Sequence, residues 1–576
     1  MDPRQPSSFL KSLFFGQIPE EMVIPYPRLT PPERADVAAV VQAVRGWAAQ
    51  HDAAAIDRAR AIPPSVREAL RPLGVFGLAI PPEHGGRGFG ATATARIGEE
   101  LARADASVAL MLSGHGALGT TGLLLHGTAE QRKRYLPRLA SGEWLAAFAL
   151  TEPTSGSDAA SIASRALPTD GGAFVLDGKK TWIVNGADAD LYTVFAQTEV
   201  EKAGAKADRI TGFLVERNQP GVEISPAEPT LGARGAAMAT LTLRNVRVAR
   251  ENVLGRVGGG FKVAMTVLNN GRLGSGAATV GSAKQLLAMV VPYTRARRQF
   301  GRPIGEFGLI KDKLGRMAMD VFAAESMVYL TTGLIDRGVA DTSVESAICK
   351  VFGSETLWRV ANESLAIAAG QGFVEGPPWE RLLRDARAHL VFQGTNEILR
   401  CFIALSGMQG PGERLAQLAD FIKWPLKGYG LAIDFVVDKL TQVVGGKVLE
   451  HAHAMLKKES VYFEDSVPEL AKQVEKTLRK HGKMISEMQF VQRRVADMAI
   501  DLYLMVACIA RATGSIAEKG APEAERETKL CRAACGRAAA RIRRTIRQFD
   551  DNDDELLKAL AKDATDAATY PFDGVL

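Results

Sequence analysis

The chain has 576 residues, of which 46% are hydrophobic and 24% are charged, and its net charge is +6. This length exceeds one ordinary domain and allows a large buried core, and the composition excludes disordered and fibrous proteins. A charge of +6 spread over so many residues is typical of a solvated surface, so we expect no nucleic-acid partner.

The five cysteines are too few for a disulfide framework, and no two of them form a Cys-x-x-Cys pair. The amino terminus has no long apolar core and no small-residue cleavage site, so no secretory signal is expected. The sequence contains no run of about 18 uninterrupted apolar residues, so no membrane-spanning helix is expected. We therefore expect reduced thiols and a cytoplasmic protein, either free or peripheral on the inner membrane face, and we predict no metal site.

Residues 1–35 are rich in proline, which breaks helices, and are predicted to form an irregular lead. Helical periods dominate from Asp36 to about Ala147, with turns such as Pro81–Gly86 between them. We therefore assign residues 1–147 to this lead and a helical domain.

The pattern changes between residues 148 and 258, where short runs rich in β-branched and aromatic residues predict strands. The runs at 173–176 and 181–184 flank Asp177-Gly178, a dipeptide typical of hairpin turns. Residues 148–258 are thus predicted to form a β domain that contains this hairpin. Further strands are predicted at 191–196, 212–216 and 239–248.

Helical periods return at about Phe261 and continue to about Met408 with few breakers, which predicts a bundle of four long helices in residues 259–408. Residues 409–576 open with glycine and proline and then supply further helices, among them 467–513 and 523–548. The predicted fold is therefore mainly α with a central β domain, followed by a C-terminal helical extension.

Four segments carry motifs. Residues 150–158 read L-T-E-P-T-S-G-S-D and residues 180–186 read K-T-W-I-V-N-G. Residues 297–301 read R-R-Q-F-G and residues 394–400 read G-T-N-E-I-L-R. In this order they resemble the flavin-contacting segments of the acyl-CoA dehydrogenases, closest to the very-long-chain branch, and the resemblance covers nearly the whole chain. It implies an N-terminal helical domain, a middle β domain and a C-terminal four-helix bundle, plus an extra C-terminal helical domain.

The resemblance implies FAD as the cofactor. A flavin needs hydrogen-bond partners along its pyrimidine edge and a flat apolar cover over its ring. By resemblance Trp182 supplies that cover, and Arg297 and Phe300 reach the adenosine diphosphate part of an FAD held mainly by the other subunit of a homodimer. The residues expected to contact FAD are Phe148, Leu150, Thr151, Ser157, Trp182, Val184, Arg297, Gln299, Phe300, Gly370, Thr395 and Glu397.

Several of these assignments have a purely structural alternative. Trp182 could be a strand aromatic packed in a domain seam, and the hydroxyls of Thr151 and Ser157 could cap turns. Arg297 stands in an arginine cluster at a predicted helix end, where cations are favourable without any ligand. The neighbouring motif residues favour the cofactor in each case.

The resemblance also implies a long-chain acyl-CoA as the substrate and electron-transfer flavoprotein as a partner if the chain is active. The residues expected at the substrate are Ser157, Arg272, Gly119, Gly122 and Gly394. Gly119 and Gly122 align with small residues that leave the acyl cavity deep in long-chain relatives. A glycine costs a helix about 1 kcal/mol relative to alanine, and close helix packing would explain both glycines equally well.

Three positions depart from the family pattern. Gln393 stands where the family has the glutamate that removes the α proton. Val184 replaces a hydroxyl residue that bonds flavin N5, and Ala366 replaces a glutamine that helps to hold the FAD pyrophosphate. A carboxamide forms hydrogen bonds but cannot hold a proton as a carboxylate does. Some relatives carry the base on another helix, and the matching position here is Gly271.

We therefore expect an acyl-CoA dehydrogenase-like oxidoreductase of fatty acid metabolism whose ordinary α,β-dehydrogenation is impaired or altered. The alternative is a catalytically silent homologue that binds acyl-CoA or serves as an assembly or scaffold protein. An engineered exchange of glutamate for glutamine would explain Gln393 alone, whereas three departures favour natural divergence.

The C-terminal extension contains a candidate membrane segment. Residues 431–444 place a narrow polar stripe on a broad apolar predicted helix. Lys423, Trp424 and Lys427 precede it and suit a membrane interface. Peripheral membrane contact is expected through about residues 423–456, and burial in a domain seam explains the pattern equally well. A solvated face is predicted for Arg541, Arg543, Arg544 and Arg547.

Overall fold

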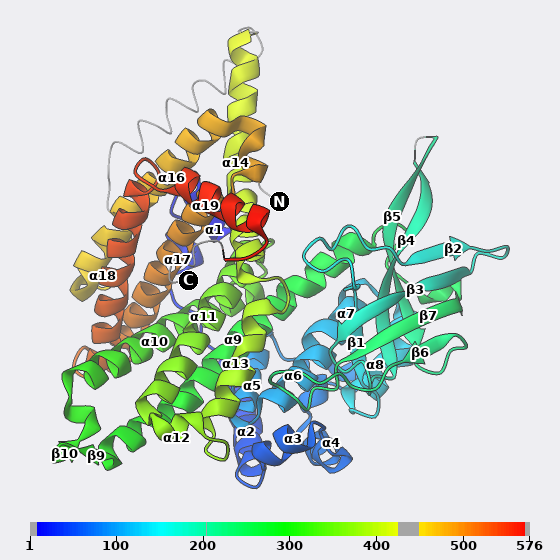
Figure 1. The fold of residues 1–576 in the computed structure, drawn as a ribbon, viewed down its shortest axis with the longest axis horizontal. Coiled ribbons are helices and arrows are strands. Elements are labelled where there is room, and N and C mark those ends of the chain that lie inside the picture. The colour runs from blue at the N-terminus through cyan, green and yellow to red at the C-terminus, as the bar shows by residue number, and fades with distance from the viewer. Residues whose placement is uncertain (1–7, 203, 424–448, 571–576) are drawn as a thin grey trace. The chain divides into compact units, whose positions relative to one another are not determined.

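The computed structural model describes residues 8–202, 204–423 and 449–570. The chain divides into two compact units, and Figure 1 draws its helices and strands. The larger unit is Val23–Leu399, and the smaller unit combines Met1–Met22 with Arg400–Leu576. The boundary between them falls inside helix α14 (Asn396–Lys423).

The larger unit begins with helices that enclose an aliphatic core. Side-chain caps fix where two of them start: Asp105 accepts two backbone N–H groups at α6, and Thr128 forms a capping box with Gln131 at α8. A π-helix, Gly114–Thr120, joins α6 to α7. The helices are α2 (Pro31–Ala48), α3 (Ala53–Ala59), α4 (Pro64–Leu70), α5 (Ala91–Ala104), α6 (Ala106–Ser113), α7 (Thr121–His126) and α8 (Ala129–Ala140).

The β domain is one eight-stranded sheet with the order β6-β7-β3-β2-β4-β5-β8, in which β1 pairs with β4. Phe195 and Leu254 of the sheet pack in one cluster with Leu136 of α8 and Val267 of α9, so the sheet and the helices share a core. The strands are β1 (Ala146–Ala149), β2 (Arg165–Pro168), β3 (Phe174–Ile183), β4 (Leu191–Lys202), β5 (Ala205–Glu216), β6 (Val222–Ile224), β7 (Ala239–Val248) and β8 (Val253–Leu254).

The hairpin predicted at residues 173–184 is wrong, because these residues form one continuous strand, β3. Asp177 accepts a backbone N–H from β7 at 2.8 Å instead of closing a turn on its own strand. Gly178 lies at an irregularity in the pairing with β7, where a Cβ would lie 2.1 Å from Ser164 Oγ. Strand β2 pairs with the other edge of β3, and the local pattern could not reveal this long-range partner.

The predicted helical bundle follows the sheet and is confirmed. Its long helices α9 and α11 approach closely, since a Cβ on Gly276 would lie 3.3 Å from Cys349 Cβ. A short hairpin, β9/β10, separates α9 from α10, and α12 separates α11 from α13. The elements are α9 (Gly260–Ala296), β9 (Arg298–Gln299), β10 (Arg302–Pro303), α10 (Gly308–Asp336), α11 (Ser343–Ala368), α12 (Gly370–Phe373) and α13 (Trp379–Val391).

Two helical stretches among the described residues, Ala106–His126 and Gly308–Asp336, are long and apolar enough to cross a membrane by composition. Most of the apolar part of each is buried inside the protein, as in the core helices of a globular fold. Residues 424–448, which hold most of the predicted membrane contact at 423–456, lie outside the described residues.

The smaller unit is a helical domain built around α17 (Gln489–Lys519), whose apolar side chains are buried along most of its length. The N-terminal lead belongs to this unit and contains a helix, α1 (Phe9–Leu13). Phe9 of α1 packs against Tyr503 of α17 with ring centroids 6.3 Å apart. The remaining helices are α14 from Arg400 onward, α16 (Lys457–His481), α18 (Glu525–Arg547) and α19 (Asp554–Ala567).

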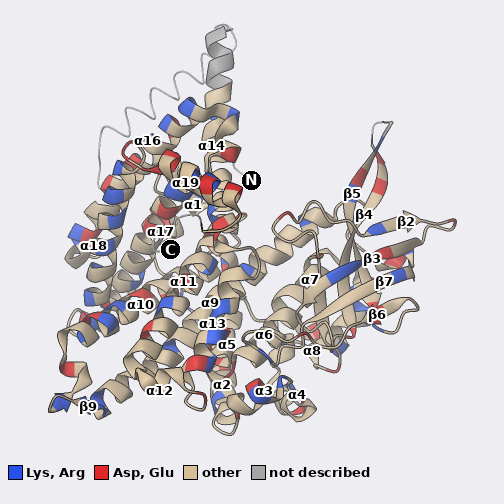
Figure 2. Ribbon diagram, viewed as in Figure 1, with Lys and Arg blue, Asp and Glu red and all other residues tan. Residues whose placement is uncertain are grey.

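Two predictions for this unit are corrected. The helix predicted over 467–513 is two helices, because Gly482 adopts a left-handed φ of 51° and ends α16. Lys and Arg predominate along α18 (Figure 2), but Arg541 does not belong to a solvated face. It donates two hydrogen bonds from Nε to the buried Asp501 of α17. Burial raises the pKa of Asp501 to about 6, although the charge of Arg541 opposes this.

Glu20 fastens the N-terminal lead to the residues that precede α16. Its carboxylate accepts the backbone N–H groups of Glu450 and His451 at 3.0 and 2.8 Å. The imidazole of His451 also bonds to it, with Nδ1 3.0 Å from Glu20 Oε2. This hydrogen bond and the charge of Glu20 raise the pKa of His451.

We predict that Glu20→Gln lowers the pKa of His451 toward its ordinary value of about 6.5. Because the pKa is raised in the folded state, the stabilisation from the charged imidazole is complete below the unfolded pKa. It is lost as the pH rises through the folded pKa. NMR titration of His451 in the two proteins measures the shift, and identical titrations would contradict the pairing.

Candidate functional site

The turn that carries Gln393 connects α13 to α14 and has a strained backbone. Gln393 and Gly394 both adopt left-handed conformations, with φ of 59° and 99°. For a residue with a Cβ this conformation costs about 1–2 kcal/mol, so surrounding contacts must hold it. Lys350 provides them, because its buried ammonium donates to Gly394 O at 2.7 Å and to Asn396 Oδ1 at 2.8 Å.

The side chain of Gln393 lies against α9. A Cβ built on Gly271 would lie 3.1 Å from Gln393 Nε2, so the two positions predicted to converge do meet. Gln393 Oε1 is buried and accepts no hydrogen bond from the described residues. Arg272 donates from Nε to Gln393 O at 3.3 Å, and burial lowers its pKa to about 10, which leaves it charged at neutral pH.

His389 lies one helical turn before Gln393 and was missed by the sequence reasoning, although it opens the same segment. Its Nδ1 is 3.1 Å from Ser275 Oγ on α9. Burial, and then the charge of Lys350, lower the pKa of His389 to about 4, so the imidazole is neutral at physiological pH. The region around Gln393 therefore contains a neutral amide, a neutral imidazole and a guanidinium.

Residues 182–185, called the flavin-facing turn because the resemblance predicts FAD there, include the last two residues of β3 and are also strained. Trp182 has φ 54° and its side chain is 58% exposed, and the buried Asn185 has φ 62°. Asn185 Nδ2 donates to Met111 O at 2.9 Å, which anchors the turn to α6. Val184 packs on the π-helix, since a Cβ on Gly114 would lie 2.7 Å from Val184 Cγ1. An exposed aromatic in this backbone conformation is typical of a functional surface.

A buried ion pair joins the two motif segments of the β domain. Lys180 Nζ donates to Glu152 Oε1 at 2.6 Å and to Leu150 O at 3.2 Å. Glu152 also accepts the N–H and hydroxyl of Ser164. Burial lowers the pKa of Lys180 to about 8, although Glu152 raises it, so the pair remains ionised at neutral pH. Both residues stand inside the motifs, but no local pattern pairs two residues that are 28 positions apart.

Through this pair the structure brings several predicted residues together. Thr151 O accepts the N–H of Thr181 at 3.0 Å, so the 150–158 segment lies beside the residue that precedes Trp182. Ser157 is exposed, and Phe148 packs on Phe195 with ring centroids 5.1 Å apart. The backbone bond thus places Thr151 beside Trp182, and the contacts of all these residues with FAD stay a prediction.

The remaining predicted residues lie elsewhere in the larger unit. Phe300, at the tip of the β9/β10 hairpin with Arg297 and Gln299, has φ 51° and is 93% exposed. Figure 1 draws this hairpin at the end of the bundle away from the sheet, so it is not brought to Trp182 within one chain. Gly370 is exposed after α11, and the exposed Glu397 and partly buried Thr395 lie at the start of α14.

Gly119 and Gly122 both make close packing contacts. A Cβ on Gly119 would lie 2.6 Å from Ala146 Cβ on β1, and a Cβ on Gly122 would lie 3.1 Å from Leu254 Cδ2. Close packing therefore explains why a glycine occupies each of these two positions. Their role in shaping an acyl cavity stays a prediction.

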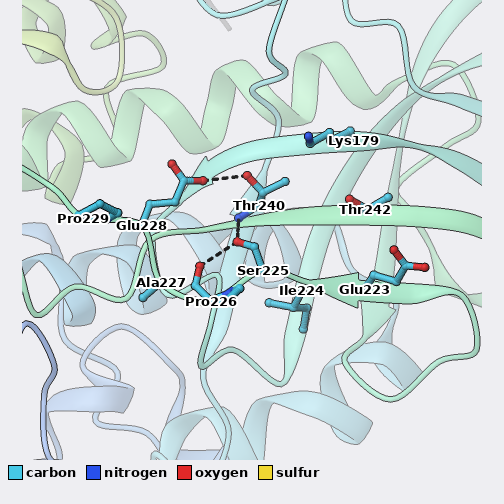
Figure 3. Close-up of a pocket in the computed structure, with 10 residues that line it drawn as sticks. All are labelled: Lys179, Glu223, Ile224, Ser225, Pro226, Ala227, Glu228, Pro229, Thr240 and Thr242. Carbon is cyan, nitrogen blue, oxygen red and sulfur yellow. Dashed lines mark hydrogen bonds between the residues drawn. The ribbon is translucent and has the colours of Figure 1, made fainter.

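A surface cleft of about 530 Å³ lies on the sheet, lined by Lys179 of β3, by residues 223–229 of β6 and the loop after it, and by Thr240 and Thr242 of β7 (Figure 3). The hydroxyl of Thr240, which lines it, donates to Glu228 Oε1 at 2.8 Å and lies 3.2 Å from the hydroxyl of Thr181. None of the predicted site residues lines this cleft. The predicted flavin and substrate residues therefore lie outside this cleft.

Family models match four stretches of the chain. They are the acyl-CoA dehydrogenase N-terminal domain (34–143), middle domain (147–246) and C-terminal domain (258–408), and the ACAD9/ACADV C-terminal domain (454–570). Very long-chain specific acyl-CoA dehydrogenase, mitochondrial, from Bos taurus is 42% identical, covering 96% of this chain and 86% of that protein. The Homo sapiens protein of the same name is 42% identical over 93% of this chain and 83% of its own length.

The chain belongs to the acyl-CoA dehydrogenase family. A solved acyl-CoA dehydrogenase complexed with FAD from Bacillus anthracis has the same fold, with a TM-score of 0.79 and 28% identity over 96% of this chain and 94% of that one. The resemblance read from the four motifs and the predicted fold class are both confirmed.

The residues of this member of the family fit a flavin. Trp182 presents an exposed flat face from a fixed turn, and the buried Gln393 Oε1 has no donor among the described residues. Such an orphaned acceptor is costly unless a bound group satisfies it. Two expected contacts are weakened by the side chains present, because Val184 and Ala366 carry no polar group.

We predict that Glu152→Gln lowers the free energy of unfolding by about 3–5 kcal/mol, because the Lys180 ammonium then stays buried without its counter-charge. Adding Lys180→Met should restore most of the loss. The matched control is Glu199→Gln, which removes the exposed Lys206 pair from the same sheet and should change stability little. Urea unfolding measures all four proteins, and equal stabilities of the Glu152 and Glu199 variants would contradict the assignment.

Proposed function

We propose that this chain binds a long-chain acyl-CoA beside FAD and that its ordinary α,β-dehydrogenation is impaired or altered. The family membership and the FAD-complexed Bacillus anthracis structure support FAD as the cofactor. The observation that carries the proposal is Gln393, a carboxamide held in a strained turn against Gly271. Neither of the two positions where a carboxylate would be expected has one.

FAD, when bound, supplies a hydride acceptor. The protein's own groups must orient the thioester and take the α proton. Gln393 can orient a bound group by hydrogen bonding but cannot take its proton, and Arg272 is a cation that holds its own protons. His389 lies with Nδ1 3.1 Å from Ser275 Oγ, and burial and the charge of Lys350 lower its pKa to about 4, which disfavours the imidazolium that would form if it took the proton. Loss of a general base costs about 10²- to 10⁴-fold in rate, so turnover should be weak.

Long-chain substrates are supported by similarity to enzymes named as specific for very long chains, at 42% identity. The small residues Gly119 and Gly122, on successive turns of the π-helix and α7, are consistent with a deep acyl cavity. Electron-transfer flavoprotein is proposed as the electron acceptor of any residual reaction.

A homodimer is proposed on the basis of the β9/β10 hairpin. Phe300 is almost fully exposed in a strained backbone, and Arg297 and Gln299 accompany it. An exposed aromatic beside arginines suits an interface or the phosphates of a cofactor held by a second copy. Location in the cytoplasm, or on the inner membrane face through about residues 423–456, is proposed from the sequence pattern alone.

The second candidate function is a catalytically silent homologue that binds acyl-CoA or assembles with another protein. Val184 and Ala366 favour it, because both remove polar groups expected at the cofactor. A colourless purified protein would support this candidate, and a bound flavin spectrum would support the first.

We predict that Gln393→Glu raises turnover of hexadecanoyl-CoA by about 10²- to 10⁴-fold, since it restores a proton acceptor at the same place. Reduction of an artificial electron acceptor by the FAD-loaded protein measures the rate. Gln393→Asn, which changes length but not charge, serves as the control and should stay inactive. An unchanged rate in Gln393→Glu would show that the missing base does not limit the reaction.

We predict that Phe300→Asp raises the dissociation constant of the homodimer about tenfold or more, because it places a charge in a central contact. Light scattering measures the molecular mass, which should fall as the dimer dissociates. Flavin absorbance measures the FAD content, which should fall with the mass. Leu167→Asp, at an exposed leucine on β2, is the control. A monomeric unsubstituted protein, or a Phe300→Asp dimer with full FAD, would contradict the proposal.

A further inference from the structure

The bridging loop (residues 228–238) connects β6 to β7 and touches both halves of the candidate site. Hydrogen bonds join the two ends of the loop beside the sheet, because Glu228 donates its N–H to Met238 O at 2.7 Å. The carboxylate of Glu228 also accepts the Thr240 hydroxyl of β7 (Figure 3). Between these ends the loop leaves the sheet and reaches the helical part of the larger unit.

On one side the bridging loop holds the flavin-facing turn. Asn185 donates its N–H to Ala236 O at 3.2 Å, and Ala187 donates its N–H to Ala237 O at 3.1 Å. These bonds flank the end of the turn that begins with Trp182. The position of the turn is therefore tied to the position of the loop.

On the other side the loop is fixed to α13, the helix that ends just before Gln393. Asp385 Oδ1 accepts the N–H of Ala233 at 2.7 Å. The preceding residue, Arg384, donates to Leu231 O at 3.1 Å. A Cβ on Gly232 would lie 2.2 Å from Arg384 O, so the backbones of loop and helix touch. Asp385 lies about two helical turns before Gln393.

The fold keeps this junction at an energetic cost. Ala233 and Ala237 have left-handed φ values of 47° and 45°, which alanine rarely adopts. Asp385 is 7% exposed, and burial raises its pKa to about 6 although the Ala233 N–H and Arg381 oppose this. A carboxylate is thus kept ionised and buried at neutral pH, where a neutral group would be more stable. Strain and a buried charge in one junction are typical of a positioning role.

We propose that Asp385 is a positioning residue, whose carboxylate fixes the bridging loop to α13 and thereby sets the distance between the flavin-facing turn and Gln393. The inference rests on the proposed function, because it takes these two turns to face one bound thioester. Asp385 acts through Ala233 and the loop and does not touch the substrate.

Three substitutions test the role in the FAD-loaded, full-length Gln393→Glu protein. Asp385→Asn keeps an oxygen that can accept the Ala233 N–H. Asp385→Ala removes the acceptor, and Asp385→Glu keeps it but extends it by one methylene. The control is Asp501→Asn in the smaller unit, another buried carboxylate whose pKa burial raises to about 6. Two readouts are taken: amide hydrogen exchange at Asn185 and Ala187, and kcat and KM with hexadecanoyl-CoA.

Asp385→Ala and Asp385→Glu should each speed amide exchange at Asn185 and Ala187 and lower kcat about 10- to 100-fold with little change in KM, since a small displacement of reacting groups is costly. Asp385→Asn should keep slow exchange and a kcat within about threefold of the parent, because its amide oxygen accepts the same bond. Asp501→Asn should leave both readouts unchanged.

Unchanged exchange at Asn185 and Ala187 in both Asp385→Ala and Asp385→Glu would overturn the inference. Equally faster amide exchange at these residues in Asp501→Asn would also overturn the inference, since it would reveal a general destabilisation of the protein. If the Gln393→Glu parent itself does not turn over, the proposed function fails, and amide exchange still decides the role of Asp385. Because Asp385→Glu retains charge and acceptor, the test remains decisive if Asp385→Ala does not fold.

Discussion

The buried ammonium of Lys350 is the contact on which the candidate site depends. By bonding Gly394 O and Asn396 Oδ1 it holds a left-handed turn between two helices, and that turn directs the Gln393 amide against Gly271. Without this contact the strain of the turn would favour other conformations. The turn that we propose as the place of the base is thus held in one conformation, and its amide cannot hold a proton as a carboxylate does.

Strained backbone recurs at the motif residues. Trp182, Phe300 and Gln393 are all bulky residues with positive φ, and the first two are largely exposed. In the β domain the Glu152–Lys180 ion pair holds the strained motif segment in place, because it fixes one motif segment to the other. Because strain of this kind persists only where the surroundings impose it, the fold holds these motif residues in defined conformations although Gln393 carries no carboxylate. Preserved form with altered chemistry is the property that we propose for this protein.

The helix, strand and helix order could be predicted from sequence because hydrophobic periods are local, and the four motifs were recognisable because they are contiguous. The predicted hairpin at Asp177-Gly178 failed because the partner of that strand, β2, is set by tertiary structure. The single helix predicted over 467–513 was wrong because the positive φ of Gly482 ends α16. The pairing of Glu152 with Lys180, and of Asp385 with the bridging loop, joins residues distant in sequence, which one sequence cannot reveal.

We propose that none of the described groups at this site removes the α proton of a bound thioester. The most direct measurement is the exchange of that proton for deuterium in D₂O, followed by mass spectrometry of hexadecanoyl-CoA incubated with the unsubstituted, FAD-loaded protein. We expect exchange no faster than for the free thioester. Exchange well above that rate would show that another residue serves as the base and would contradict the account.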